Sequence, residues 1–386
     1  MKKNICNIYI FLWCLYNLQG TLYARGTIIS QLLLILLLFI SFFYYFRLLI
    51  YHHLPLVLKI LSCLFFIWTI YGFVIIVYGN GVQRVLNYSY LKNIYIALLP
   101  IFVFYCFVKE GLLSESLLKK WSIVFLILGI IRFNTYSDES LARAIERGSN
   151  QEEFTNSKAY VIVAVMPLLP LFYKKPVFQY VLLGICLLYT FLGVKRGAIL
   201  SGVVCSVWFI YESFKEKRNN GANIWRLLLT TIFIVGIVYA IQQMVLSSDY
   251  FIKRFDATMD GNSSGRDKLF ITYGTFFINQ TNVFHILFGN GADATMRLLN
   301  EFAHNDWLEL AIDNGLVVVV LYLLYWISMF NTLKIAKSSN YTCYLIIGMF
   351  IWIYLMKSFY SMSYNDIPIY SSSALGYALA NLNTTE

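Results

Sequence analysis

The sequence predicts an all-α membrane protein, a polytopic bundle of about twelve transmembrane helices. Of its 386 residues, 59% are hydrophobic and only 13% are charged, and the run from Thr27 to Phe46 carries no charge at all. A soluble core cannot absorb that much apolar surface. A helix needs roughly 20 apolar residues to cross a membrane, and an open sheet leaves unpaired backbone groups in lipid, so a helical bundle is expected.

The expected helices follow the apolar segments in order. The first contains Ile5 to Tyr16. It resembles the apolar part of a signal peptide, but no small-x-small cleavage site precedes Arg25, so we expect it to be retained as a span. The spans are expected at about residues 5–19, 27–49, 54–78, 94–108, 119–134, 159–173, 177–193, 197–211, 224–245, 315–333, 341–360 and 367–381. They divide the chain into a nine-span bundle over 1–246, a large loop over 247–314 and three further spans over 315–386.

Lysines and arginines are distributed unequally between the two sides. With the N-terminus in the cytoplasm, the cytoplasmic side holds Lys2, Lys3, Arg47, Lys109, Lys119, Lys120, Lys174, Lys175, Lys215, Lys217, Arg218, Arg226, Lys334 and Lys337. The short loops on the opposite side hold only Arg25, Arg84, Lys92, Lys195 and Arg196. The positive-inside rule therefore favours both termini inside, which places the longer loops 132–158 and 247–314 outside.

The large loop contains its own local signals. Ser264-Gly265-Arg266-Asp267 is typical of a helix start and predicts a helix over Lys268 to Phe277, which Asn279 to Asn282 would end. Phe288-Gly289-Asn290-Gly291 predicts a sharp turn. Ala303 to Glu309 is polar, holds a single imidazole and precedes an apolar helix. We therefore expect the chemistry of the protein in this loop.

Charge and cysteine usage exclude other classes of function. The formal net charge is +10, but the basic residues are scattered through loops, which argues against a nucleic-acid-binding domain. The seven cysteines lie in apolar segments and form no CxxC pair, so neither a disulfide framework nor a metal site is predicted. The large loop also has no tight acidic cluster such as DxD. We expect neither a metal nor another cofactor.

A pair of cations at the end of an apolar span indicates an anion-binding site. Lys195 and Arg196 lie at a hairpin between two spans, where an unpaired charge is costly. The alternative interpretation is that both extend to lipid head groups. The same predicted face holds Lys253, Arg254, Arg266, Lys268 and His304. Because arginine binds phosphate in a bidentate manner, such cations would stabilise a diphosphate leaving group.

His304 is the candidate for a general base. The other histidines lie at a predicted cytoplasmic span end or in an apolar stretch: His52, His53 and His285. His304 shares its face with the arginines, which favours proton transfer or hydrogen bonding to a substrate. Asn305, Asp306 and Trp307 follow it and are the candidates for contact with an acceptor sugar. Asn305 or Asp306 also suits the N-cap of the following helix, and Trp307 suits an aromatic belt at the membrane interface.

Together these residues resemble the O-antigen ligase and O-antigen polymerase superfamily. The resemblance rests on four motifs in order: Arg196-Gly197-Ala198, Gly265-Arg266-Asp267, Phe288-Gly289-Asn290-Gly291, and His304-Asn305 with the later Gly315 and Val318. The last spacing is similar to the ligase signature His-x10-Gly-x-x-Thr/Val. The resemblance is strongest over residues 193–325, and it departs from many members at Lys195, where they have Ser.

The resemblance implies a GT-C-like fold and a glycosyltransferase of the bacterial inner membrane, with its active site facing the periplasm and a role in lipopolysaccharide biosynthesis. The donor would be an undecaprenyl-diphosphate-linked oligosaccharide or polysaccharide, and the acceptor a sugar hydroxyl of lipid A-core. Arg196 and Arg266 would bind the diphosphate, with Lys195 and Arg254 as further cations. His304 would deprotonate or orient the acceptor hydroxyl in an inverting displacement that needs no metal.

Two alternative functions remain open at this point. A polymerase of the same superfamily would use another lipid-linked glycan as acceptor; the histidine spacing favours a ligase, but polymerases share this region. A polytopic transporter also fits twelve spans with both termini inside. Transporters usually show two similar halves, whereas the one large loop expected here lies off-centre.

Overall fold

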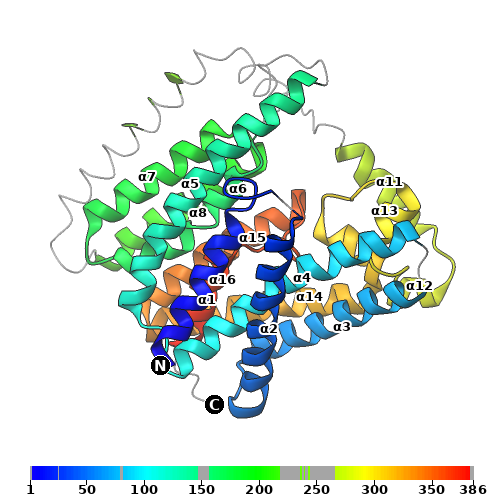
Figure 1. The fold of residues 1–386 in the computed structure, drawn as a ribbon, viewed down its shortest axis with the longest axis horizontal. Coiled ribbons are helices and arrows are strands. Elements are labelled where there is room, and N and C mark those ends of the chain that lie inside the picture. The colour runs from blue at the N-terminus through cyan, green and yellow to red at the C-terminus, as the bar shows by residue number, and fades with distance from the viewer. Residues whose placement is uncertain are drawn as a thin grey trace.

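The computed structural model describes residues 2–24, 26–78, 81–146, 156–217, 235–236, 239, 242–243 and 266–382 (Figure 1). Every regular element in these ranges is a helix, which confirms the all-α prediction. The elements are α1 (Lys2–Asn17), α2 (Ile28–Tyr51), α3 (Leu56–Tyr78), α4 (Gly81–Lys109), α5 (Glu115–Glu146), α6 (Ala159–Val163), the 3-10 helix η1 (Met166–Phe172), α7 (Pro176–Leu192), α8 (Arg196–Lys217), α11 (Arg266–Ile278), α12 (Val283–Phe288), α13 (Ala294–Leu299), α14 (Asp306–Ser339), α15 (Tyr341–Tyr360) and α16 (Ile369–Ala380).

Six of the described helices are long and apolar enough to cross a membrane. These are α2, α3, α4, α8, α14 and α15. Two shorter apolar segments cover Ala159–Phe172 and Pro176–Leu192. The expected span over residues 224–245 lies outside the described residues. A helical membrane protein is therefore supported, and the count of twelve spans stays a prediction.

The outer helices present apolar side chains that a soluble protein would bury. On α2, Leu32, Ile35, Phe39, Phe43 and Phe46 recur every three or four residues, and each is between 50% and 72% exposed. Residues with this spacing share one face of a helix. The opposite face of α2 packs against α4. An apolar face of this length belongs in contact with lipid.

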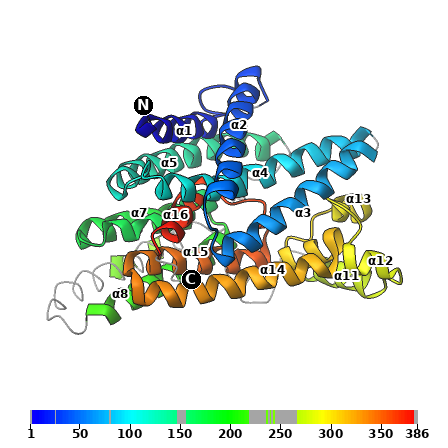
Figure 2. The ribbon, with the colours of Figure 1, turned by 90° about the horizontal axis from the view of Figure 1, so that it is seen from below.

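The centre of the bundle is built on a helix of small residues. Every residue of α16 is buried, and the helix packs against α4, α15 and η1. Figure 2 shows α16 in the middle of the molecule, with α4, α7 and α15 around it. A Cβ atom at Gly376 would lie 2.6 Å from the Ile101 carbonyl oxygen, so only glycine permits this approach. Small side chains let helices approach closely where no water drives them together.

One expected span is broken in the structure. The sequence predicts a single helix over residues 159–173, but α6 ends at Val163 and the chain continues as the 3-10 helix η1. Pro167 and Pro170 lack the backbone N–H that an α-helix requires at these positions. All residues of η1 are buried. Non-helical backbone at membrane depth is tolerated where protein surrounds it.

The structure describes the second part of the large loop, from Arg266 onward. The helix predicted over Lys268 to Phe277 is confirmed as α11, and the turn predicted at Phe288-Gly289-Asn290-Gly291 follows α12 directly. The loop was expected to extend to residue 314, but α14 already begins at Asp306. Its helical geometry breaks at Gly315, which has φ 77° and ψ 178°. Gly315 therefore separates two helical segments, and the span predicted from residue 315 begins at this break.

The turn after α12 and the kink in α14 lock together through two glycines. A Cβ at Gly289 would lie 2.3 Å from the Asp313 carbonyl oxygen, and a Cβ at Gly315 would lie 2.4 Å from the Leu287 carbonyl oxygen. Gly289 has φ 74°, a left-handed value that favours glycine. The Asn290 backbone N–H donates to the Ile312 carbonyl at 2.9 Å. We call this contact the glycine interlock; it holds residues 288–291 against the start of α14.

Candidate functional site

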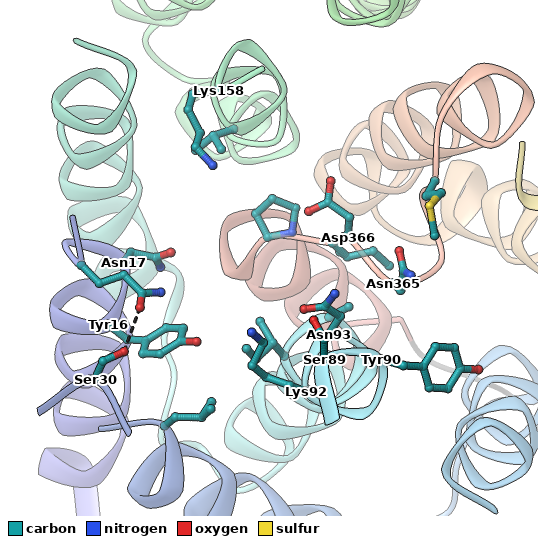
Figure 3. Close-up of a pocket in the computed structure, with 18 of the residues that line it drawn as sticks. Tyr16, Asn17, Ser30, Ser89, Tyr90, Lys92, Asn93, Lys158, Asn365 and Asp366 are labelled. Carbon is teal, nitrogen blue, oxygen red and sulfur yellow. Dashed lines mark hydrogen bonds between the residues drawn. The ribbon is translucent and has the colours of Figure 1, made fainter. Parts of the chain in front are cut away.

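The principal pocket of the described residues has a volume of about 890 Å³ and is built from five separate segments of the chain (Figure 3). Its lining residues are Tyr16, Asn17, Gln19, Gly26, Ser30, Gln31, Leu34, Ser89, Tyr90, Lys92, Asn93, Ile96, Ala97, Arg132, Lys158, Val161, Asp293, Phe302, His304, Ser361, Met362, Asn365, Asp366, Ile367 and Pro368. All five segments belong to loops, or the span ends beside them, that the positive-inside pattern predicts on the outer side. The fold therefore gathers five of the predicted outer loops around one pocket, whereas the hairpin with Lys195 and Arg196 does not line it.

The loops predicted on the opposite side contact one another instead. Arg47 forms an ion pair with Glu110, and the Tyr341 hydroxyl donates to the Glu212 carbonyl at 2.6 Å. His52 and Cys106 join Glu110 in the one grouping of described residues with a metal-ligand arrangement, but this carboxylate already has Arg47 as its partner. None of these six residues lines the pocket.

His304 lies in the pocket wall, between α13 and α14, and two cations from distant parts of the sequence lie near it. Burial of the imidazole lowers the pKa of His304, and the charges of Arg266 and Lys195 lower it further, whereas Glu301 opposes them. Arg266 and Lys195 therefore lie near enough to act on His304 electrostatically, but only His304 of the three lines the pocket. At neutral pH the imidazole is uncharged and able to accept a proton.

The two arginines of the resemblance each begin a helix. Arg196 is the first residue of α8, and Arg266 is the first residue of α11. A cation at a helix N-terminus opposes the helix dipole, at a cost of about 0.3–1 kcal/mol. The same helix end offers free backbone N–H groups to an anion. Arg254 lies outside the described residues.

The glycine of the Arg196-Gly197-Ala198 motif makes room for two tyrosines. A Cβ atom at Gly197 would lie 2.1 Å from the Tyr160 hydroxyl oxygen and 2.7 Å from the Tyr360 ring. Tyr360 also donates its hydroxyl to the Gly197 carbonyl at 3.1 Å. Arg266 lies close enough to act electrostatically on both hydroxyls. Neither tyrosine carried a sequence signal, because each lies in an apolar helix rich in aromatic residues.

The three residues after His304 use their polar atoms inside the protein. Asn305 is the N-cap of α14, and its side chain accepts a hydrogen bond from the Leu308 N–H at 3.1 Å. The sequence predicts this capping role as the alternative to contact with a sugar. Trp307 donates its indole N–H to the Ser358 hydroxyl at 3.2 Å and stacks on Phe359. Neither residue lines the pocket, and their contact with an acceptor sugar stays a prediction.

Asp306 is also enclosed. Its side chain is fully buried, and one carboxylate oxygen accepts from the Ser363 N–H at 2.7 Å. The other accepts from the Tyr322 hydroxyl at 2.7 Å and from the Ser363 hydroxyl. Asp306 thus ties the start of α14 to the segment between α15 and α16. We refer to this arrangement as the Asp306 clamp.

An ion pair that the sequence did not reveal forms part of the pocket wall. Lys357, buried at 3% exposure, donates to the Asp366 carboxylate at 2.5 Å and to its carbonyl at 3.1 Å. Desolvation alone would raise the pKa of Asp366, but the Lys357 ammonium outweighs it and holds this pKa below its ordinary value. The available signal was the placement of Lys357 in an apolar span, where a charge normally has a partner.

Backbone strain gathers around the same site. His304 has φ 51°, Asp293 has φ 52° and Val194 has φ 49°, all in the left-handed region. A β-branched residue such as valine is rare there. Asp293 and His304 line the pocket, and Val194 directly precedes Lys195. Strained residues of this kind cost about 1–3 kcal/mol each and concentrate at functional sites.

The site therefore combines a neutral imidazole, nearby cations and a wide polar pocket. No protein-family model matches the chain, and no curated protein matches it.

Proposed function

We propose that this protein is a glycosyltransferase of the bacterial inner membrane, of the O-antigen ligase and polymerase type. It transfers an undecaprenyl-diphosphate-linked glycan to a sugar hydroxyl, with lipid A-core as the acceptor of a ligase, and its site faces the periplasm. The observation that supports the proposal is His304 in the wall of a large pocket, with Arg266 and Lys195 near enough to act on its imidazole electrostatically.

The chemistry follows from these groups. The acceptor hydroxyl oxygen attacks the anomeric carbon of the donor while its proton passes to the His304 imidazole. The bond between the anomeric carbon and the diphosphate oxygen breaks, and undecaprenyl diphosphate leaves with the bonding electrons. Arg266 and Lys195, with Arg196 and Arg254 by resemblance, stabilise the negative charge that develops on the diphosphate. The energy comes from the donor, and no metal or cofactor takes part.

Donor binding would also activate the base. In the free protein burial lowers the pKa of His304, and the charges of Arg266 and Lys195 lower it further. A bound diphosphate offsets these charges, so the pKa of His304 rises towards its ordinary value and the imidazole becomes a stronger base. Proton transfer is thereby coupled to the presence of the donor. Asn305, Asp306 and Trp307 would hold His304 in place.

The proposal is tested with purified protein in a membrane mimetic, supplied with a lipid-linked donor and an acceptor glycan. We expect His304→Ala and Arg266→Ala to abolish transfer. Both variants should still insert into the membrane and unfold at the same temperature as the wild type. Lys174→Gln, a change of one exposed cation away from the pocket, is the matched control. Full activity of either alanine variant would refute the role given to that residue.

The glycan profile of cells that lack the protein distinguishes a ligase from a polymerase. Bare lipid A-core with long chains retained on the lipid carrier identifies a ligase. Core carrying a single repeat unit identifies a polymerase. An unchanged glycan profile contradicts both and returns the transporter as the leading interpretation.

A further inference from the structure

An apolar surface on the large loop belongs to none of the predicted spans. It lies on α12 and on the last residue of α11, within the loop predicted over residues 247–314. No residue of α12 is buried. Five apolar side chains of this surface are between 39% and 81% exposed: Ile278, Val283, Phe284, Leu287 and Phe288. A contiguous apolar surface of this kind marks contact with a partner or a membrane.

Two contacts fix the level of α12 against the membrane helices. The Tyr71 hydroxyl of α3 donates to the Phe288 carbonyl, and the apolar stretch of α3 continues beyond Tyr71 to Val74. The turn after α12 meets α14 through the glycine interlock at Gly315, where the span predicted from residue 315 begins. Figure 1 and Figure 2 both show α12 at the end of the molecule to which α3 and α14 extend. The C-terminal end of α12 therefore lies level with the outer ends of two spans.

The polar groups at this end of α12 have partners within the protein. The Gly289 N–H donates to the His285 carbonyl at 2.9 Å, and the His285 ring donates from Nδ1 to the Gly289 carbonyl at 3.1 Å. The Phe288 carbonyl accepts from Tyr71. In lipid no water can satisfy such groups, so they need partners of this kind. The C-terminal end of α12 meets this requirement.

The exposed face of α12 continues an apolar stripe of α3. Four side chains of α3 recur every three or four residues and are between 49% and 61% exposed: Ile70, Phe73, Val74 and Val77. Tyr71 lies at the edge of this stripe, since Val74 is one turn further along the helix. The bond from Tyr71 to the Phe288 carbonyl makes the two apolar surfaces adjoin. Because α3 is apolar and long enough to cross a membrane, the lipid that covers its stripe also reaches α12.

We propose that α12 and the end of α11 lie in the outer leaflet of the lipid bilayer, with Val283, Phe284 and Phe288 inserted among the lipid chains. The partner is the bilayer itself, because the surface adjoins a lipid-facing stripe and residues 278–288 contain no lysine, arginine, aspartate or glutamate. The glycine interlock connects this anchored helix to α14, whose first residue follows His304 by two positions. The inference does not depend on the proposed glycan transfer.

The test measures what surrounds a nitroxide spin label attached at Phe284→Cys in the full chain in nanodiscs. Cys63→Ser is the background, because Cys63 is the exposed one among the seven cysteines. Collisions of the label with oxygen, which concentrates in lipid, are compared with collisions with a water-soluble nickel chelate. Phe39→Cys on α2 is the reference for lipid, and Asp267→Cys at the exposed start of α11 is the reference for water. We expect the ratio of oxygen to nickel collisions at Phe284→Cys to be severalfold higher than at Asp267→Cys and close to that at Phe39→Cys.

Labels on α3 then give the depth. We expect the label at Phe288→Cys to lie between those at Ile70→Cys and Val77→Cys, because Phe288 is bonded to Tyr71. A label at Phe288→Cys in water, above Val77→Cys, would contradict this placement.

Two outcomes at Phe284→Cys would overturn the proposal. Frequent collision with nickel would mean that the face lies in water. An immobile label that neither reagent reaches would mean that protein covers it, either another segment of the chain or a second copy. Val283→Cys repeats the measurement at the neighbouring exposed position. An unfolding temperature equal to that of the Cys63→Ser protein verifies that each labelled chain keeps its fold.

Discussion

Replacement of Asp306 distinguishes a positioning role from direct contact with the acceptor. The carboxylate of the Asp306 clamp accepts three hydrogen bonds from Ser363 and Tyr322, and no part of it is exposed. Asparagine has the same shape and keeps one carbonyl oxygen for the Ser363 N–H. Its amide group can donate to the two hydroxyls, which rotate to accept. We therefore expect Asp306→Asn to keep the fold and most of the activity.

Alanine at this position leaves three buried donors without their acceptor. An unsatisfied buried donor costs about 1–3 kcal/mol. The hydroxyl oxygens of Tyr322 and Ser363 lie 3.3 Å apart, so they can satisfy each other in part. The Ser363 N–H has no such substitute. We expect Asp306→Ala to lower the free energy of unfolding by about 3–5 kcal/mol, a large fraction of the stability of a typical domain.

The assay is thermal unfolding of the purified variants in detergent, together with transfer activity below the unfolding temperature. Asp267→Asn makes the same chemical change at an exposed position of α11 and serves as the control. An Asp306→Asn variant with unchanged stability and no activity would mean that the carboxylate takes part in the chemistry. An Asp306→Ala variant as stable as the wild type would refute the clamp itself.

Three further predictions concern the base, the glycine interlock and metal dependence. Burial and the charges of Arg266 and Lys195 lower the pKa of His304, so kcat/KM, which reports the free enzyme, should fall only below pH 6.5. The profile of kcat reports the complex with the donor, and its acidic limb should lie at higher pH than that of kcat/KM. Arg266→Gln or Lys195→Gln should move the acidic limb of kcat/KM to higher pH. Profiles identical to the wild type would contradict the influence of these cations on the pKa of His304. Gly289→Ala and Gly315→Ala should each lower the unfolding temperature, because the added Cβ would lie within 2.4 Å of backbone atoms; alanine variants with wild-type melting curves would disprove the interlock. Transfer should persist in excess EDTA, and its restoration only by a divalent ion would refute the metal-independent mechanism.

Much of the fold was predictable because long apolar segments leave few alternatives to membrane helices. The break between α6 and η1 was missed because Pro167 and Pro170 lie in a segment that is apolar throughout. The span predicted from residue 315 begins at the break in α14, and the N-cap predicted at Asn305 starts the segment before that break; the sequence did not show that the glycine interlock joins these two segments in one element. These differences depend on tertiary contacts that a hydropathy pattern does not contain.

The candidate site was predictable in part. Lys195, Arg266 and His304 stood out as polar groups beside apolar helices, and the fold brings them together. The Lys158 and Asp366 wall was not predicted, because its members lie about 200 residues apart and neither belongs to a motif. Their proximity depends on how the helices pack. A charge in an apolar helix, Lys357, was the one sequence signal for this wall.

The position of α16 in the middle of the bundle sets the order in which the site can form during synthesis. Asn365 and Asp366 complete one wall of the pocket, and they reach it only when α16 packs against α4, whose residues leave the ribosome some 270 residues earlier. A nascent chain that stops before residue 369 lacks α16, so the apolar sides of α4 and η1 that α16 covers would contact each other or lipid. Such a chain would hold His304, Arg266 and Lys195 without a complete pocket. The pocket would thus be complete only after the last part of the fold has been inserted, and the proposed activity would begin only then.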